Sequence, residues 1–152
     1  MAKCRLLLVS LLAISTVLVM SVAGAFAART PEQTVESYLK AMKEQKYDQA
    51  YQYLSKAMAG QKDAETWTKE TTYQMQTAEV KIFEYEVFPG KIDGDVAKVP
   101  NILKSQDKFL NQLGATEYEL YTLIKENGEW RIDQQEQVDK ADQAKWFKKP
   151  AS

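Results

Sequence analysis

Apolar residues near the start of the chain recur with the spacing of an α-helix. In the segment TPEQTVESYLKAMKE, residues 30–44, the apolar positions are Val35, Tyr38, Leu39 and Met42. These positions correspond to i, i+3, i+4 and i+7, so they share one face of a helix. The segment opens with Thr and Pro and has Gln three residues after the Thr, which is the pattern of a capping box with Pro at the first helical position. The pattern predicts an amphipathic helix that starts at this Thr-Pro pair.

The same spacing continues in the next segment, which contains the tyrosine-rich stretch KYDQAYQYLS. Its apolar stripe consists of Tyr47, Ala50, Tyr51, Leu54 and Met58. A second helix is therefore predicted, with Gly60 as its C-terminal stop. Tyr53 lies off the stripe and is expected to face solvent or a neighbouring element. A third, shorter helix is predicted from Asp63, a good N-cap residue, to about Tyr73.

From residue 78 the period changes to that of β-strands. In EVKIFEYEVF the apolar residues alternate, and the phase slips by one residue at Ile82–Phe83, as a β-bulge requires. The segment PGKIDGD follows as a turn. A strand is predicted from Val96 to about Leu103, where Pro100 indicates an edge position or a bend. Two further β-rich runs meet at Asn127-Gly128, the strongest short-range signal for a hairpin.

Helices followed by about four strands indicate the α+β class, with N-terminal helices packed on one face of an antiparallel sheet. Residues 28–136 are predicted to form this domain. Residues 137–152 form a C-terminal tail, predicted to be either a short helix or a partly ordered extension.

Residues 1–27 have the organisation of a secretory signal peptide. Two basic residues begin the segment, an uncharged run follows, and Ala25 and Ala27 provide the small-x-small spacing of a cleavage site. Cleavage after Ala27 predicts a periplasmic or secreted protein. The alternative is an uncut anchor in the inner membrane, because the uncharged stretch 6–28 has 23 residues, enough for a helix to span ~30 Å of hydrocarbon.

Residues 28–152 contain neither Cys nor His. Disulfides, thiolate nucleophiles, zinc sites and histidine-based acid–base catalysis are therefore excluded from this part of the chain. An exported chain without disulfides fits the bacterial cell envelope. Removal of the two basic residues of the signal segment leaves 18 basic and 21 acidic residues, interspersed, with a net charge of −3. Neither a nucleic-acid partner nor a cofactor or metal ion is predicted.

The segments TPEQTVESYLKAMKEQKYDQAYQYLS and Gly128–Trp130 resemble a known group of proteins. They are similar to small bacterial envelope domains of the nuclear transport factor 2-like superfamily, a cystatin-like cone, and in particular to a domain of unknown function described as lumazine-binding-like. The matching positions are Thr30–Glu32, Tyr47–Tyr51 and the Gly-x-Trp of the last hairpin. The chain departs from the group at Gln45-Lys46, where members commonly have Gly-Asp or Gly-Asn. The resemblance implies a curved sheet wrapped around a helix, with one open mouth.

Five aromatic side chains are candidates to line this cone and bind a ligand. They are Tyr38, Tyr51, Trp67, Tyr85 and Tyr118. Tyr and Trp can stack on a flat ligand while a polar tip stays in water. The alternative is plain core packing, which needs the same stripe of residues.

Two pairs of carboxylates are candidates for catalytic groups. Glu84 and Glu86 flank Tyr85, and Glu117 and Glu119 flank Tyr118. Because strand side chains alternate, each pair is expected on the solvent face, opposite its tyrosine. No catalytic residue is predicted from this pattern.

The sequence therefore predicts an exported, non-catalytic domain that binds a small apolar or aromatic molecule, or a partner protein, in the cell envelope. A structural module that forms homodimers without a ligand is the first alternative. An enzyme that uses a tyrosine and a carboxylate is the second, and it requires at least one of the four glutamates to point inward with a raised pKa.

Overall fold

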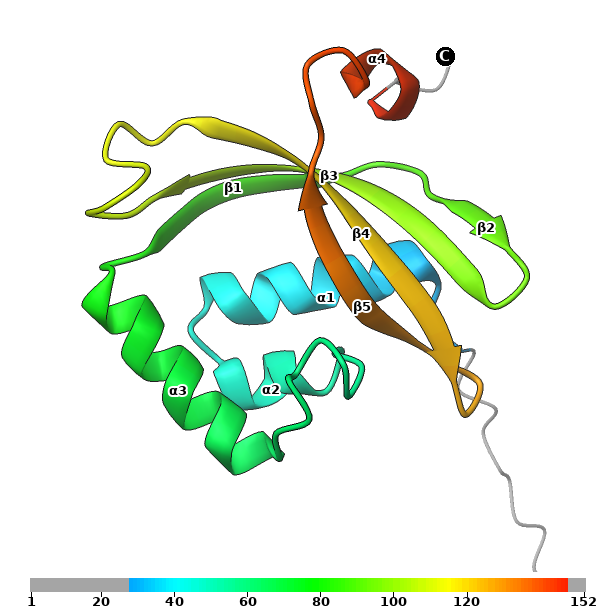
Figure 1. Cartoon of the computed structure of the whole chain (residues 1–152), viewed down its shortest axis with the longest axis horizontal. Coiled ribbons are helices and arrows are strands. Elements are labelled where there is room, and N and C mark those ends of the chain that lie inside the picture. Colours follow the sequence, from blue (N-terminus) through cyan, green and yellow to red (C-terminus); the bar gives the residue numbers. More distant parts are fainter. Residues whose placement is uncertain (1–27, 148–152) are drawn as a thin grey trace, which may run out of the picture.

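A computed structural model describes residues 28–147. The predicted signal peptide, residues 1–27, and the last residues of the tail, 148–152, lie outside the described part of the chain. The described residues form three helices, then a curved antiparallel sheet of five strands, then a short C-terminal helix (Figure 1). The predicted α+β class is confirmed, with one strand more than expected.

The first helix, α1, spans Pro31–Lys43 and has the predicted cap. The backbone N–H of Gln33 donates to Oγ1 of Thr30, and the side chain of Gln33 accepts from the backbone N–H of Thr30. The third helix, α3, spans Ala64–Thr77, and its N-cap Asp63 accepts from the backbone N–H of Thr66. α3 is longer than predicted, but no residue within it is fully buried.

The second helix, α2, spans only Tyr47–Tyr51 and ends earlier than predicted. The following backbone pairs instead with the sheet: Ile132 N–H donates to the carbonyl of Tyr53, and Ser55 N–H donates to the carbonyl of Ile132, both at 2.8 Å. Leu54 thereby forms a parallel bridge with Ile132. These bonds to a strand distant in sequence satisfy the same backbone groups that a longer helix would have used.

The strands are β1 (Lys81–Val87), β2 (Lys91–Asp93), β3 (Val96–Gln106), β4 (Thr116–Glu126) and β5 (Glu129–Gln137). Their order is β1-β3-β4-β5, and β2 pairs with β3 beyond the end of β1. The register of β1 shifts between Ile82 and Glu84, which confirms the predicted bulge at Phe83. The β4–β5 turn has φ of 52° at Asn127 and 83° at Gly128, as a type I′ hairpin requires.

The prediction of an edge position for Pro100 is wrong, because β3 lies between β4 and the pair β1 and β2. The carbonyl of Pro100 accepts from the N–H of Phe88, just after β1 ends. The missing N–H of Pro100 therefore faces the β1–β2 connection, where no regular ladder bond is needed. Proline is tolerated in β3 because, on the side that Pro100 faces, β3 pairs with two separate strands, β1 and β2. Pro100 lies at the gap between them.

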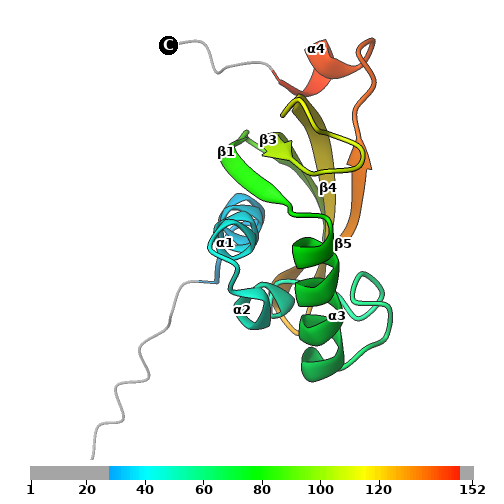
Figure 2. The ribbon, with the colours of Figure 1, turned by 90° about the vertical axis from the view of Figure 1, so that its left-hand side faces the viewer.

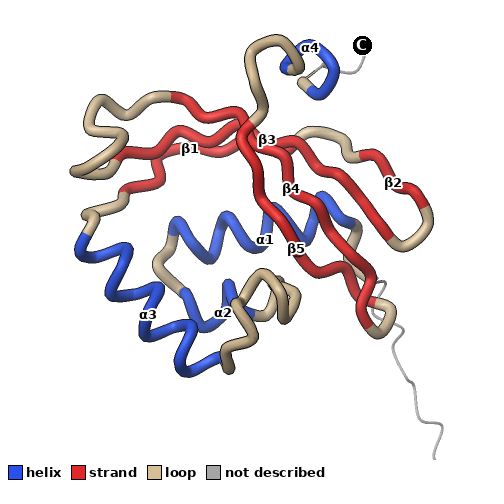
Figure 3. Tube along the Cα trace, viewed as in Figure 1, coloured by secondary structure: helices blue, strands red, loops and turns tan. Residues whose placement is uncertain are grey.

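The core lies between α1 and the concave face of the sheet (Figure 2). α1 contributes Val35 and Leu39, and the facing strands contribute Val99, Leu123 and Ile132, all at most 2% exposed. Helices α1, α2 and α3 all lie on this side of the sheet (Figure 3). This arrangement leaves the opposite face of the sheet to the C-terminal tail.

The tail forms a short helix, α4 (Gln143–Trp146), above the face of the sheet opposite α1 (Figures 1 and 2). The ring of Phe147 stands edge-on to Phe88 and Tyr118, with centroid separations of 5.4 and 5.0 Å. The short-helix alternative for the tail is thus the observed one within the described residues. No helix among residues 28–147 is both long and apolar enough to cross a membrane.

Candidate functional site on the concave face of the sheet

The concave face carries a buried acidic side chain that the sequence pattern did not predict. Glu119 of β4 is 3% exposed, and it lies directly across from Asn101 of β3, which is 0% exposed. Glu117, two residues earlier on the same face, is half-buried. The expectation that this glutamate pair faces solvent is therefore wrong. Glu84 and Glu86 of β1 are exposed, as expected.

Three strands each supply one hydrogen-bond donor to the Glu119 carboxylate. Asn101 Nδ2 donates to Oε2 at 2.8 Å, and Gln135 Nε2 of β5 donates to Oε1 at 2.7 Å. The hydroxyl of Tyr121 also donates to Oε2, at 3.3 Å. Gln135 is exposed, so this network connects the buried carboxylate to the surface of the molecule.

Burial raises the pKa of Glu119, and the nearby Glu117 carboxylate raises it further, against the three hydrogen bonds that lower it. Partial burial, and then the charge of Asp107, also raises the pKa of Glu117. Burial, followed by the charge of Glu119, raises the pKa of the phenols of Tyr38 and Tyr121. Both phenols therefore keep their protons at neutral pH and can act as hydrogen-bond donors.

The Oδ1 atom of Asn101 is buried and has no hydrogen-bond partner among the described residues. A buried carbonyl-type oxygen without a partner costs ~1–3 kcal/mol, so such atoms are rare and call for an explanation. It lies next to the Glu119 carboxylate, whose two oxygens already accept from Asn101, Gln135 and Tyr121. The unpartnered Oδ1 atom is therefore the acceptor in this network that an N–H or O–H donor would satisfy.

Tyr38, one of the predicted ligand-binding aromatics, lies in the core close to this network. It is 7% exposed and stands edge-on to Tyr121, with 6.1 Å between ring centroids. Tyr85 of β1 is half-buried against the same core, and Nζ of Lys43 lies 6.0 Å from its ring centroid. Both residues lie on the concave side of the sheet, and their role in binding a ligand stays a prediction.

Tyr51 and Trp67 form a second aromatic pair, with centroids 5.8 Å apart. The hydroxyl of Tyr51 donates to the carbonyl of Lys62 at 2.8 Å, so its polar tip is used within the fold. Both rings are half-buried against the core. They anchor α3 to α2, which is a packing role.

Tyr118 was predicted to line the cone, but it lies on the other face of the sheet. It points away from Tyr121 and packs against Phe147 of the tail. The reason is register: Glu117, Glu119 and Tyr121 share one face of β4, and Tyr118 alternates with them. The aromatic side chain on β4 that faces the helices is Tyr121.

The sequence pattern did not indicate Asn101, Tyr121 or Gln135, and it named Glu119 only among the four glutamates of the enzyme alternative. One signal was available, because Leu120 and Tyr121 are adjacent and both apolar, which indicates a strand covered on both faces. Such a strand does not reveal from its own pattern which of its faces meets the helices. Among residues 28–147, no cluster of three or more acidic, His or Cys side chains could hold a metal ion.

The fold, with helices packed in the hollow of a curved antiparallel sheet, also occurs in solved structures. One is a domain of unknown function with a cystatin-like fold from Nostoc punctiforme, with a TM-score of 0.52 and 11% identity over 73% of this chain and 77% of that one. This chain has a cystatin-like fold. The comparison bears on the fold alone, and at that level it agrees with the cystatin-like cone that the sequence resemblance implied.

Two further structures are similar at lower TM-scores. An NTF2-like protein of unknown function from Cytophaga hutchinsonii has a TM-score of 0.43 and 14% identity, over 72% of this chain and 88% of that one. Bd1075 of Bdellovibrio bacteriovorus has a TM-score of 0.49 and 13% identity over 68% of this chain. The match spans only 37% of the length of the Bd1075 chain. No family model matches the sequence, and no curated protein matches it.

Proposed function

We propose that the protein is a non-catalytic binding module that holds a small molecule against the concave face of its sheet. The observation that carries the proposal is the unpartnered Oδ1 atom of Asn101, fully buried beside the Glu119 carboxylate. The half-buried ring of Tyr85 on this face supplies apolar contact area. A small, largely apolar or aromatic ligand with one or two N–H or O–H donors fits this combination.

Native mass spectrometry of the protein purified from its own host tests this proposal. We expect a bound small molecule in the wild type and in the control Glu84→Gln, whose glutamate is exposed. The variant Asn101→Leu keeps the number and branching of the side-chain heavy atoms but removes the orphan acceptor, and it should lose the ligand. A spectrum that shows only the bare polypeptide, with no ligand recovered by extraction, would contradict the proposal.

A catalytic function is the second candidate, and one observation favours it. Of the four glutamates considered, Glu119 points inward, and burial raises its pKa. The hydroxyl of Tyr121 lies 3.3 Å from the carboxylate, so a general acid–base group and a phenol donor stand side by side. Carboxyl-carbon NMR titration tests this candidate. A Glu119 pKa at or below the ordinary value of about 4.3 would remove it.

We also propose that the protein is exported and belongs to the lumazine-binding-like group. The pattern of residues 1–27 and the capping box of α1 support these two points. Determination of the N-terminal residue of the purified protein tests export: Ala28 indicates cleavage, whereas Met1 indicates the membrane-anchored alternative. Self-association through the sheet remains a prediction. Light scattering that shows a monomer at high protein concentration would contradict it.

A further inference from the structure

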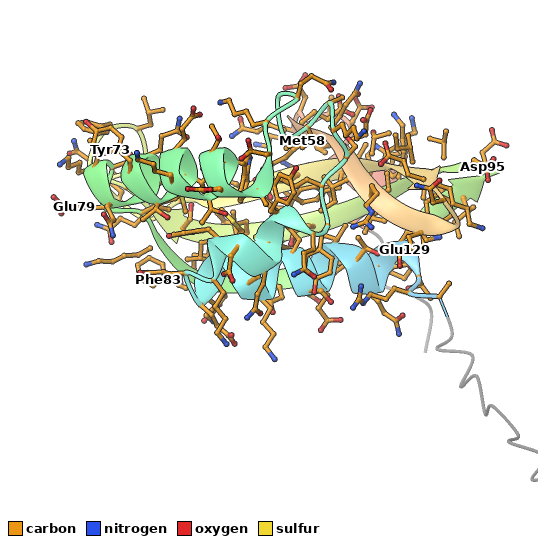
Figure 4. The ribbon with its side chains drawn as sticks, turned by 90° about the horizontal axis from the view of Figure 1, so that it is seen from below. Met58, Tyr73, Glu79, Phe83, Asp95 and Glu129 are labelled. Atoms are coloured by element: carbon orange, nitrogen blue, oxygen red, sulfur yellow. The ribbon has the colours of Figure 1, made fainter. Side chains whose placement is uncertain are left out.

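Two adjoining cavities lie beside the β4–β5 hairpin, at the end of the molecule where the described chain begins. The first has a volume of about 320 Å³ and the second about 520 Å³, and both are lined by Arg29, Glu129 and Arg131. Figure 4 places Glu129 at this end and Phe83 at the opposite end of the molecule. We propose that the two cavities form one binding site for a small molecule that carries an oxyanion, either a carboxylate or a phosphate.

The two arginines of this site are the only ones between residues 28 and 152. Arg29 precedes α1, and Arg131 comes from β5, so the fold brings together two cations that are distant in sequence. The guanidinium of Arg29 lies 5.3 Å from the ring centroid of Tyr53. Among the described residues, no hydrogen bond or ion pair engages this guanidinium, so its fork of N–H donors is available to an oxyanion.

Arg131 forms an ion pair, but the partner carboxylate is largely exposed to solvent. Its guanidinium donates to Oε2 of Glu129, whose side chain is 62% exposed, whereas that of Arg131 is 27% exposed. An ion pair with a solvent-exposed carboxylate contributes little because water competes for both groups. An oxyanion held between both guanidinium groups can therefore replace Glu129 as the partner of the less exposed arginine.

The walls of the first cavity favour an anion attached to a flat body. Tyr53 and Trp130 line it, and both side chains are half-buried against the core. Charged residues along the two cavities comprise three cations and two anions. They are Arg29, Lys56, Arg131, Glu126 and Glu129. The site is thus locally positive in a chain whose overall charge is −1.

The proposed cleavage after Ala27 would strengthen this site. Ala28 lines the first cavity, so a new N-terminal ammonium group, with an ordinary pKa of about 7.7–8.0, would stand beside the two guanidinium groups. This step rests on the proposed export of the protein. The role proposed for the two arginines does not depend on this cleavage.

The experiment uses the full chain as purified from its host, in a Trp67→Phe, Trp146→Phe background, which leaves Trp130 as the reporter within the site. Inorganic phosphate and benzoate are titrated separately while tryptophan emission is recorded. We expect a saturable change, and at least about tenfold weaker binding in Arg29→Gln and in Arg131→Gln, since each variant loses charge-assisted hydrogen bonds to the oxyanion. Lys104→Gln, which removes an exposed cation on β3, is the matched control and should bind like the parent.

A response to phosphate alone identifies a phosphate ligand, and a response to benzoate alone identifies an aromatic carboxylate. No saturable response to either probe, or equal affinity in Arg29→Gln and the parent, would overturn the proposal. Arg29 is exposed, so its substitution leaves the fold intact and keeps the test decisive even where Arg131→Gln unfolds. Asn101→Leu reports on the concave face separately, so failure of one site is distinguishable from failure of the other.

Discussion

The sequence Glu-Tyr-Glu occurs twice in the sheet, and its two copies are oriented in opposite ways. In β1, Tyr85 faces the helices while Glu84 and Glu86 are exposed. In β4, Glu119 faces the helices and Tyr118 packs on the tail. Both segments lie next to β3. The same local pattern therefore produced a solvated acidic face in one strand and a buried carboxylate in the other.

The difference arises from contacts that are distant in sequence. The bulge at Phe83 sets the phase of β1, so that Tyr85 lies across from Leu103 on the concave face. In β4, the phase is set by Tyr121, which is 1% exposed beneath α1. Phe147 then supplies an apolar partner for Tyr118 on the opposite face. Alternation decides which residues share a face of a strand, but only tertiary contacts decide which face is inside.

The largest expected effect is that of Glu119→Ala, compared with Glu84→Ala. Removal of the Glu119 carboxylate leaves the buried amide of Asn101 without its acceptor and opens a small cavity. We expect a loss of about 2–3 kcal/mol in the free energy of unfolding in urea. For Glu84→Ala, the change should stay within about 0.5 kcal/mol. Equal losses in the two variants would show that the two glutamates occupy similar environments.

The next effect concerns the apolar cover of the outer face. Phe147→Ala removes the ring that contacts Tyr118 and Phe88. Because this ring is only half-buried, we expect a loss of about 1–2 kcal/mol in thermal or chemical unfolding, less than for a core phenylalanine. Phe109→Ala is the control, since Phe109 is 60% exposed, and it should change stability little. An unchanged unfolding free energy in Phe147→Ala would show that the contact with the tail does not determine the orientation of Tyr118.

A smaller effect separates the two tyrosine hydroxyls of β4. Tyr121→Phe removes the hydrogen bond to Glu119 and should cost about 1 kcal/mol. Tyr118→Phe removes a hydroxyl on the opposite face and should cost less than about 0.5 kcal/mol. Urea denaturation of both variants provides the comparison. A larger loss of unfolding free energy in Tyr118→Phe than in Tyr121→Phe would contradict the position of the hydrogen-bond network on the concave face.

The smallest effect at any single pH is expected for Glu119→Gln, but it should depend on pH. Because burial raises the pKa of Glu119, the folded protein binds this proton more tightly than the unfolded chain. Protonation therefore stabilises the fold below the unfolded pKa of about 4.3, and this stabilisation is lost as pH rises through the raised folded value. Relative to E119Q, the wild type should lose stability from pH 4 toward neutral pH. A difference that does not change with pH would contradict the raised pKa.

Much of the fold followed from the sequence because its signals are local. The capping box at Thr30, the bulge at Phe83 and the turn at Asn127-Gly128 each depend on a few neighbouring residues. The end of α2 and the central position of Pro100 did not follow, because both depend on pairing with distant strands. The candidate site was missed for the same reason.

The bridge between Leu54 and Ile132 has a consequence for how the chain folds. Ser55 also donates to the Asp133 carboxylate at 2.7 Å, across 78 residues of sequence. The segment after α2 therefore completes its structure only when β5, the last strand, has docked against it. Contacts of such long sequence separation slow folding. A chain that emerges N-terminus first, as during synthesis, stays incompletely folded until nearly all of it has emerged.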